Sequence, residues 1–361
     1  KAKRPSYFVA ENVDGILSLD NGQVIEHILG AFQSCGYEVE YKLLHAADFG
    51  TPQKRKRVFI VGTRSDLCVS TPYRFPEPTH RDNATMLGNV PDDAIERFFN
   101  QYWKNYILDF SLPEVERIDE KYAARGALEE LWLSTKHSPW KTIIQALDGI
   151  TEPGTESGLL NHVGSQYKIV EKDFTGHRKT DPDKPCPTIL ARGNGGGGVV
   201  AIPHHEGHRR LTVRESARVQ DFPDDFEFRG GLMSMYRQIG NAVPVCLAKA
   251  VASQFPLVAP ETGLVEQTPL TVASLFSGCG GMDLGFIEAG FDIIWANDNF
   301  DDAVSTYQLN IGDHIVNKDV HDVEPSEIPD IEVMIGGFPC QGFSIANTGR
   351  SDGDERNELY L

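Results

Sequence analysis

The sequence predicts an α/β fold, with a mostly parallel sheet, helices on both faces and a smaller loop-rich domain. Two observations predict the sheet: short apolar strands alternate with helix-length segments over residues 271–336, and again over residues 6–62. Such alternation indicates βαβ units, whose strands run parallel. A third observation predicts the smaller domain, because Pro and Gly are dense and hydrophobic periodicity is weak between about 76 and 205.

The C-terminal part carries three predicted strands, Thr271–Phe276, Phe291–Ala296 and Glu332–Ile335. Helical stretches over Met282–Ala289 and Asp301–Leu309 separate them. Each strand runs into a glycine-rich or polar turn. In open α/β sheets, ligands bind outside the carboxyl ends of the strands, so these turns are candidate binding loops.

The N-terminal part continues the pattern with a strand over Ser6–Ala10 that ends at Glu11-Asn12-Val13. Apolar residues recur at helical spacing over Gln23–Gln33, and we expect this helix to stop at Gly36. Two more strands are predicted, at Glu38–Leu44 and Arg57–Gly62.

These patterns predict the domain division. Residues 1–75 and 236–361 would form the two parts of one sheet domain, and residues 76–235 would form the smaller domain. The stretch 254–269 is punctuated by proline and lacks strong periodicity, so we expect a connector there.

The formal net charge of −18, taken alone, argues against a nucleic-acid partner, because phosphate binding needs local positive charge. The charge is unevenly distributed. Residues 1–260 hold 31 basic and 33 acidic side chains, whereas residues 261–361 hold 3 basic and 19 acidic ones. The acidity therefore belongs to the last 101 residues and does not exclude a DNA-binding surface elsewhere.

Composition limits the remaining classes of protein. No apolar run approaches the roughly 20 residues of a membrane span, and no signal-peptide core follows the basic start, so we expect no membrane association. The six cysteines are scattered without a CxxC pair, which argues against a zinc ribbon or a disulfide framework and suits the cytoplasm. His204, His205 and His208 lack the Cys or carboxylate partners of a metal site, so no metal is expected.

The glycine-rich turn Phe276–Gly281 allows a ligand to approach the backbone closely. It has neither the GK[ST] ending of a phosphate loop nor the full GxGxxG spacing of a dinucleotide site. Asp298, after the next strand, could hold ribose hydroxyls, and Asp319 could hold an adenine amino group. Tight packing alone would also explain such a turn.

Two side chains could carry covalent or proton-transfer chemistry. Cys340 follows a strand in a glycine-flanked loop, where a cysteine can act as a thiolate nucleophile, although a lone Cys is more commonly a small core residue. Glu11 ends a strand, and partial burial there would raise its pKa enough for it to give a proton. A helix cap or a solvated turn is the alternative for Glu11.

The basic run Gln53–Arg57 leads into a strand. Side chains alternate along a strand, so Arg55 and Arg57 would point to one face while Lys54 and Lys56 point to the other. One pair could enter a site while the other contacts phosphates. A solvated surface is an equally good interpretation of a basic run.

Six blocks together resemble the DNA cytosine-5 methyltransferases. They are FSGCGG, GFPCQGFS, ENV, QKRKR, GNAVP (Gly240–Pro244) and RRLTVRESARVQDFP (Arg209–Pro223). The family's usual order places the glycine turn and the PCQ loop first. Here the chain begins just before ENV and ends just after Arg356–Leu359, which resembles the family's RxxL block. We interpret this order as a circular permutation of a Rossmann-like S-adenosylmethionine-dependent methyltransferase sheet, with residues 76–235 as the target-recognition domain.

The resemblance implies methyl transfer from S-adenosylmethionine to C5 of a cytosine flipped out of a specific double-stranded DNA sequence, in a bacterial restriction–modification system. It implies that Cys340 attacks C6, that Glu11 holds N3 and the exocyclic amine, and that Arg57, supported by Arg55, holds O2 or a phosphate. We expect a monomeric enzyme. A tRNA cytosine-5 methyltransferase and a non-catalytic DNA-binding regulator remain alternatives, and the long variable region favours DNA.

The resemblance also implies cofactor contacts. Phe276 would stack on adenine, Asp298 would hold the ribose although the family usually has Glu there, and Asp319 would accept from the adenine amine. The remaining implied cofactor residues are Gly278, Gly281, Asn241, Val243 and Pro339. The implied DNA-binding residues are Gln53, Lys54, Arg192, Gly193, Arg210, Gln341 and Ser344.

Overall fold

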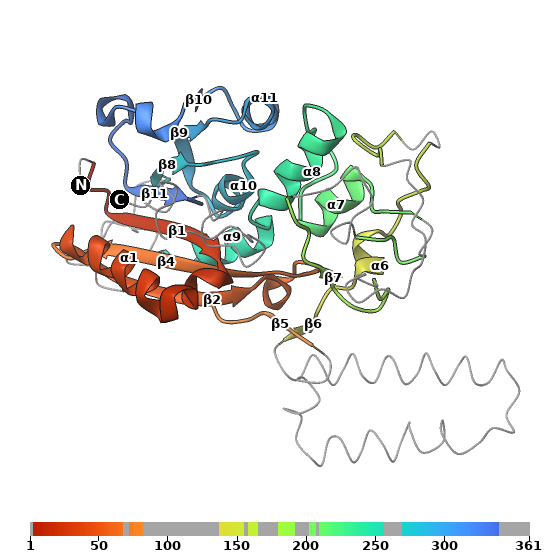
Figure 1. Ribbon diagram of the computed structural model, residues 1–361, viewed down its shortest axis with the longest axis horizontal. Coiled ribbons are helices and arrows are strands. Elements are labelled where there is room, and N and C mark those ends of the chain that lie inside the picture. The colour runs from red at the N-terminus through yellow and green to blue at the C-terminus, as the bar shows by residue number, and fades with distance from the viewer. Residues whose placement is uncertain are drawn as a thin grey trace, which may run out of the picture.

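A seven-stranded sheet in the order β10-β9-β8-β11-β1-β4-β2 forms the centre of the computed structural model (Figure 1). The structure describes residues 3–67, 72–82, 137–154, 158–164, 180–191, 202–206, 209–255 and 269–338. The strands of the sheet are β1 (Tyr7–Val13), β2 (Tyr37–His45), β4 (Lys56–Arg64), β8 (Thr271–Leu275), β9 (Asp292–Asp298), β10 (Ile315–Asn317) and β11 (Val333–Gly336). The predicted α/β class is confirmed, and so are the six predicted strands, with shifted ends.

The first five strands of that order are parallel, and β4 runs antiparallel to both β1 and β2. Strand β10 was not predicted, because its three residues are too few to show alternation. Counted from β8, the parallel strands have the spatial order 3-2-1-4-5, which is the order at the start of a common doubly wound sheet. The strand that would begin such a sheet therefore lies at residue 271, and β1 takes the fifth place beside β11.

Helices cover both faces of the sheet. Neighbouring residues of a strand face opposite sides, and in β1 the residues on both sides are apolar. On one face, Tyr7 and Val9 of β1 pack with α9 (Val245–Ala252) and α10 (Gly281–Glu288). On the other face, Phe8 and Ala10 pack with α1 (Gln23–Ser34) through Ile25 and Ile28. Helix α1 stops where expected, with Gly36 in the left-handed conformation at φ 87°. Helix α11 (Asp301–Asn310) follows β9.

A second group of short elements lies beside the sheet, where Figure 1 shows α6 (Ile143–Ala146), α7 (Val213–Val219) and α8 (Leu232–Asn241) together. Two-stranded pairs join this group to the chain near the sheet: β3 (Gln53–Lys54) with β7 (Cys186–Pro187), and β5 (His80–Arg81) with β6 (Ser138–Pro139).

Helix α7 begins with a capping box, in which Thr212 and Glu215 exchange side-chain and backbone hydrogen bonds. Its apolar side shares a core with α8 and with Cys279 of the glycine turn. Helix α8 crosses the predicted boundary at residue 235, so the domain division stays a prediction. Among the helices described, none is long and apolar enough to cross a membrane.

Candidate active site

A cavity of about 250 Å³ lies at the carboxyl edge of the parallel strands. It is lined by the end of β1, the glycine turn after β8, the end of β9 and the end of α8. These segments lie far apart in sequence, from Glu11 to Asp298, and the parallel sheet brings them together because its strands end at one edge. Of the predicted residues within the described ranges, it includes Glu11, Arg55, Arg57, Phe276, Gly278, Gly281, Asp298, Asn241 and Val243.

Glu11 and Arg57 form an ion pair in this cavity. The Nε atom of Arg57 lies 2.7 Å from Oε1 of Glu11, and each side chain is 11% exposed. Burial raises the pKa of Glu11 above its ordinary value, while the positive charges of Arg57 and Arg55 act in the opposite direction. Glu11 therefore retains a proton more readily than a surface carboxyl group and is held in one orientation by Arg57.

Arg55 is buried and does not point freely into the cavity. Its guanidinium donates to the carbonyl of Ile189 at 2.8 Å and to the carbonyl of Gly240 at 2.9 Å. These bonds fix the end of α8 against the strand that carries Arg57. The alternation predicted for the basic run is present: Arg55 and Arg57 are covered, while Lys54 and Lys56 are exposed.

The prediction that Gln53 contacts DNA is not supported. The Gln53 side chain is fully buried, donates to Gln220 Oε1 at 3.0 Å and accepts from the amide of Ile189 at 3.0 Å. Arg210, also expected to contact DNA, is only 8% exposed and lies in an isolated bridge with Pro203. Both side chains are therefore covered by the protein, and the partners of Gln53 satisfy the polar atoms that its burial removes from water.

Asn12 connects β1 to the segment after β11. Its side-chain amide donates to the carbonyl of Phe338 at 3.3 Å, and the Asn12 side chain is 1% exposed. Six predicted site residues lie outside the described ranges. Four of them follow Phe338, namely Pro339, Cys340, Gln341 and Ser344, and the other two are Arg192 and Gly193.

The glycine turn is tied to the end of β9. The amide of Gly278 donates to Oδ2 of Asp298 at 2.8 Å, and the amide of Phe300 donates to Oδ1 of the same carboxylate at 2.9 Å. Burial raises the pKa of Asp298. Phe276 and Gly278 both adopt positive φ angles, of 54° and 56°. A positive φ in a phenylalanine is an outlier of the kind found at ligand sites.

The two glycines expected to make room for a ligand differ. A Cβ atom added at Gly278 would meet nothing within 4 Å, so this position faces open space. A Cβ atom at Gly281 would lie 2.6 Å from the carbonyl oxygen of Val243. Close packing of α10 against the segment after α8 therefore requires glycine at position 281. The sequence suggested contact with a ligand instead, because Gly281 belongs to a glycine-rich turn.

Asp319 is not among the residues that line the cavity. Its side chain is 47% exposed and accepts from the ring Nδ1 of His321 and, at 3.1 Å, from the side-chain amide of Asn299. The expected contact with an adenine amino group is thus not supported directly. Asn299 does line the cavity and stands between Asp319 and the site.

The cavity residues that the sequence did not predict include Arg237, Phe300 and Asp283. Arg237 places its guanidinium carbon 4.3 Å from the centroid of the Phe300 ring. Asp283, fully buried, accepts from the hydroxyls of Ser274 and Tyr307, each at 2.8 Å, and burial raises its pKa to about 6. Arg237 had one available signal, since it lies four residues before Asn241 and shares a helix side with it. Asp283 and Phe300 had none.

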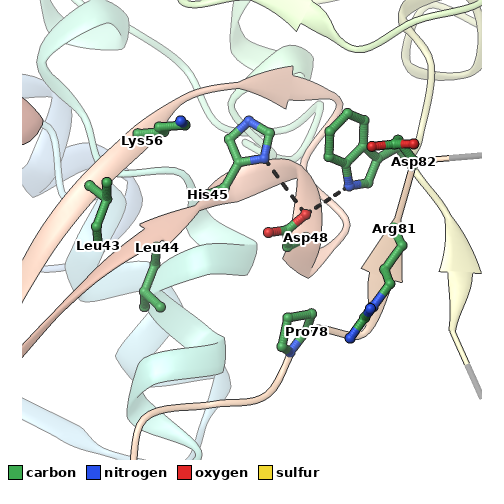
Figure 2. A pocket seen from close by; sticks show the side chains of 9 residues that line it. Leu43, Leu44, His45, Asp48, Lys56, Pro78, Arg81 and Asp82 are labelled. Carbon is green, nitrogen blue, oxygen red and sulfur yellow. Dashed lines mark hydrogen bonds and ion pairs between the residues drawn. The ribbon is translucent and has the colours of Figure 1, made fainter. Parts of the chain in front are cut away.

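A second cavity, of about 420 Å³, lies at the end of β2 and has no residue in common with the first. Figure 2 shows Asp48 between His45 and an indole ring. That ring belongs to Trp140, whose Nε1 donates to Asp48 at 2.9 Å, and Nδ1 of His45 lies 3.6 Å from the same carboxylate. Lys56 and Arg81 add positive charge to its lining. These contacts fasten the chain near β6 to the edge of the sheet.

Comparison with known proteins gives consistent results. The family described as C-5 cytosine-specific DNA methylase matches residues 1–256 and 270–361. The Type II methyltransferase M.NgoFVII of Neisseria gonorrhoeae is 33% identical over 271 residues, which cover 70% of this chain and 60% of that protein. The Type II methyltransferase M.BsuRI of Bacillus subtilis is 33% identical over 291 residues, which cover 74% and 52%. The chain thus spans about half to three-fifths of the length of these relatives.

Among solved structures, the S. pombe Dnmt2 methyltransferase matches with a TM-score of 0.37 and 18% sequence identity, covering 68% of this chain and 63% of that one.

Proposed function

The chain belongs to the C-5 cytosine-specific DNA methylase family, and from this premise we propose that it transfers a methyl group from S-adenosylmethionine to C5 of cytosine in double-stranded DNA. Two relatives carry the name Type II methyltransferase, and we propose the same place for this chain, as the modifying partner in a restriction–modification system.

One observation carries the proposal. The Glu11–Arg57 pair, which suits a polarised base, opens into the same cavity as the glycine turn and Asp298, which suit a nucleoside. A methyl donor and a cytosine would have to meet at one point, and this cavity lies between the two groups of residues. No comparable combination of an acid, a guanidinium and a glycine turn lines the second cavity.

The residues around the glycine turn fit S-adenosylmethionine. The open space at Gly278 admits a ligand against the backbone, Phe276 offers an aromatic ring, and the buried carboxyl group of Asp298 suits a pair of ribose hydroxyls. Asn241 and Val243 also line the cavity. The bound cofactor would supply an electrophilic methyl group to this cavity.

The chain's own residues would make the cytosine reactive. Because C5 is a poor nucleophile, we propose that the thiolate of Cys340 forms a bond to C6, which shifts the electron pair of the C5–C6 double bond onto C5. Glu11, held by Arg57, would donate its proton to N3 and accept from the exocyclic amine, so that negative charge does not accumulate on the ring. After the methyl group has joined C5, a base removes the C5 proton and the thiolate leaves, which restores the double bond.

The target carbon is inaccessible inside a duplex, so the cytosine must be flipped out of the helix into the cavity. Lys54 and Lys56 are exposed on the strand face opposite Arg57, and Lys56 lies with Arg81 around the second cavity. We propose that these cations contact phosphates beside the flipped nucleotide, since phosphate contacts set the position of a protein on DNA.

We also propose that the chain is a circular permutation of the family's usual order. The support is topological: the parallel strands have the order of a doubly wound sheet only when β8 counts as the first strand, and β1 pairs with β11 as the fifth.

A transfer assay with a labelled methyl donor tests the function. We expect label in duplex DNA and none in tRNA, and we expect Cys340→Ala to abolish transfer. Cys35→Ala is the matched control, because Cys35 lies at the end of α1, away from the cavity lining. Label in tRNA alone, or full activity of Cys340→Ala, would overturn the proposal.

A further inference from the structure

Arg237 lies in α8 and lines the cavity, with its side chain against Phe300 at the start of α11. Its guanidinium carbon is 4.3 Å from the centroid of the Phe300 ring, and both side chains line the cavity. A guanidinium over an aromatic face is attracted by the ring and is held in one plane. The stack therefore fixes an exposed, flexible side chain at the opening of the site.

The guanidinium of Arg237 has different partners from those of the other two arginines that line the cavity. Arg57 is paired with Glu11 at 2.7 Å, and Arg55 donates to two backbone carbonyls. Within the part of the chain that the structure describes, Arg237 forms no ion pair, although its positive charge acts on Asp298 in the direction that lowers the pKa of that carboxyl group. The positive charge of this guanidinium can thus be used by an anionic group of a ligand.

Its position along the cavity indicates which group that is. Arg237 lies one helical turn before Asn241, on the same side of α8. The carbonyl of the next residue, Gln238, accepts from the thiol of Cys279 at 3.7 Å, which places this turn of α8 against the glycine turn. Asp298, the proposed ribose partner, is bonded to the other side of that turn through Gly278. Arg237 therefore lies near the part of the cavity that extends from the ribose towards Asn241.

We propose that Arg237 binds the carboxylate of the amino-acid end of the cofactor, with Phe300 holding the guanidinium in place. This inference rests on the proposed function, because it assumes that the cavity takes S-adenosylmethionine. A planar guanidinium donates two parallel N–H bonds to a carboxylate, and an ammonium group cannot reproduce that geometry. The carboxylate is also the only anionic group of this cofactor. Of the three arginines that line the cavity, Arg57 is paired with Glu11 and Arg55 donates to backbone carbonyls. The guanidinium of Arg237 instead stacks on Phe300.

The test compares two ligands that differ only in that carboxylate, S-adenosylhomocysteine and its decarboxylated form, by titration calorimetry. We expect Arg237→Gln to weaken binding of S-adenosylhomocysteine by about 10-fold or more and to change binding of the decarboxylated ligand by less than about 2-fold. Arg237→Lys should recover only part of the loss, and Phe300→Leu should cause a smaller loss with the same selectivity. Arg229→Gln is the control, because Arg229 is half exposed, pairs with Glu227 at 3.2 Å and does not line the cavity.

Each other outcome overturns the inference in a recognisable way. An equal loss for both ligands would mean that Arg237 only shapes the wall, and no loss would mean that it does not touch the cofactor. Weaker binding of duplex DNA with unchanged ligand binding would assign Arg237 to a phosphate. If the unaltered protein binds neither ligand, the proposed function fails as well. If it binds both and only the selectivity of Arg237→Gln is absent, the proposed function stands.

Discussion

At the scale of the residue, the site depends on how each charge is held. Glu11 is buried, and burial raises the pKa of its carboxyl group. The ion pair with Arg57 holds that carboxyl group in one orientation. Arg55 donates both of its terminal guanidinium nitrogens to backbone carbonyls, so these two groups bind the protein and not a ligand. Arg57 in β4 and Arg55, just before that strand, are therefore two residues apart and hold different partners.

Glu11→Gln should lower turnover by about 100-fold while DNA binding persists, because an amide keeps the shape of the side chain but cannot transfer a proton. For the same reason, activity of the unaltered protein should fall as the pH rises through the elevated pKa of Glu11, where the protonated form is lost. Steady-state kinetics over a pH series measures both effects. The exposed Glu38→Gln is the control, and unchanged turnover in Glu11→Gln would refute the proton-donor role.

Asp283 should make stability depend on pH. Its pKa is raised to about 6, so the folded state binds a proton more tightly than the unfolded state, and stability is lost as the pH rises from about 4 to about 6. The part due to Asp283 is at most about 3 kcal/mol. Urea unfolding of Asp283→Asn should lack this part of the pH dependence, whereas the exposed Asp313→Asn should retain it. Parallel curves for Asp283→Asn and the unaltered protein would contradict the assignment.

At the scale of the element, close packing positions the glycine turn. Helix α10 begins at Gly281 against the carbonyl of Val243, and Gly285 of the same helix approaches the Cβ atom of Ala248 in α9 so closely that its own Cβ would lie 2.5 Å away. These contacts join the helix after the glycine turn to the helix after GNAVP. The glycine turn and the GNAVP segment, which both line the cavity, are thereby packed directly against each other.

Gly281→Ala should reduce the free energy of unfolding by about 1–3 kcal/mol, because the added methyl group collides with backbone that cannot move aside. Gly30→Ala is the matched control. It lies in α1 with nothing within 4 Å of the added atom, so it should stabilise the protein by about 0.5–1 kcal/mol. Denaturant unfolding measures both. A Gly281→Ala protein that kept its stability and lost only cofactor binding would show that the glycine serves the ligand instead.

The sequence was sufficient for elements with clear periodicity and for the position of Glu11, which lies near the end of β1 and lines the cavity. It was not sufficient where a side chain depends on distant partners. Gln53 looks like a surface residue in a basic run, yet its partners lie more than 130 residues away in the chain. The Arg237–Phe300 stack joins α8 to α11 and has no local pattern that would reveal it.

At the scale of the whole molecule, the uneven charge follows the architecture. The acidic last 101 residues supply β8 to β11 and the glycine turn, while the nearly neutral remainder supplies Glu11 and the exposed lysines near β4. The two parts meet along the β1–β11 ladder, through α9 and α10, and where Asn310 bonds the backbone of Glu227. The net charge of −18 therefore reflects mainly the part of the chain that carries β8 to β11.

The two parts should remain together without a covalent link. A protease site placed between residues 256 and 269 would separate the chain into the segment that ends after α9 and the segment that begins before β8. We expect both pieces to co-elute after cleavage and to retain cofactor binding, because the β1–β11 pairing and the α9–α10 packing do not depend on the connector. Separation of the pieces at micromolar concentration would contradict this description of the sheet.

The most direct test of the central claim is bisulfite sequencing of DNA from a bacterial host without cytosine methylation of its own. Expression of the unaltered chain should leave 5-methylcytosine at one recurring sequence, and an equal amount of folded Cys340→Ala protein should leave none. Absence of methylation with the unaltered chain, or the same methylation pattern with Cys340→Ala, would contradict the account.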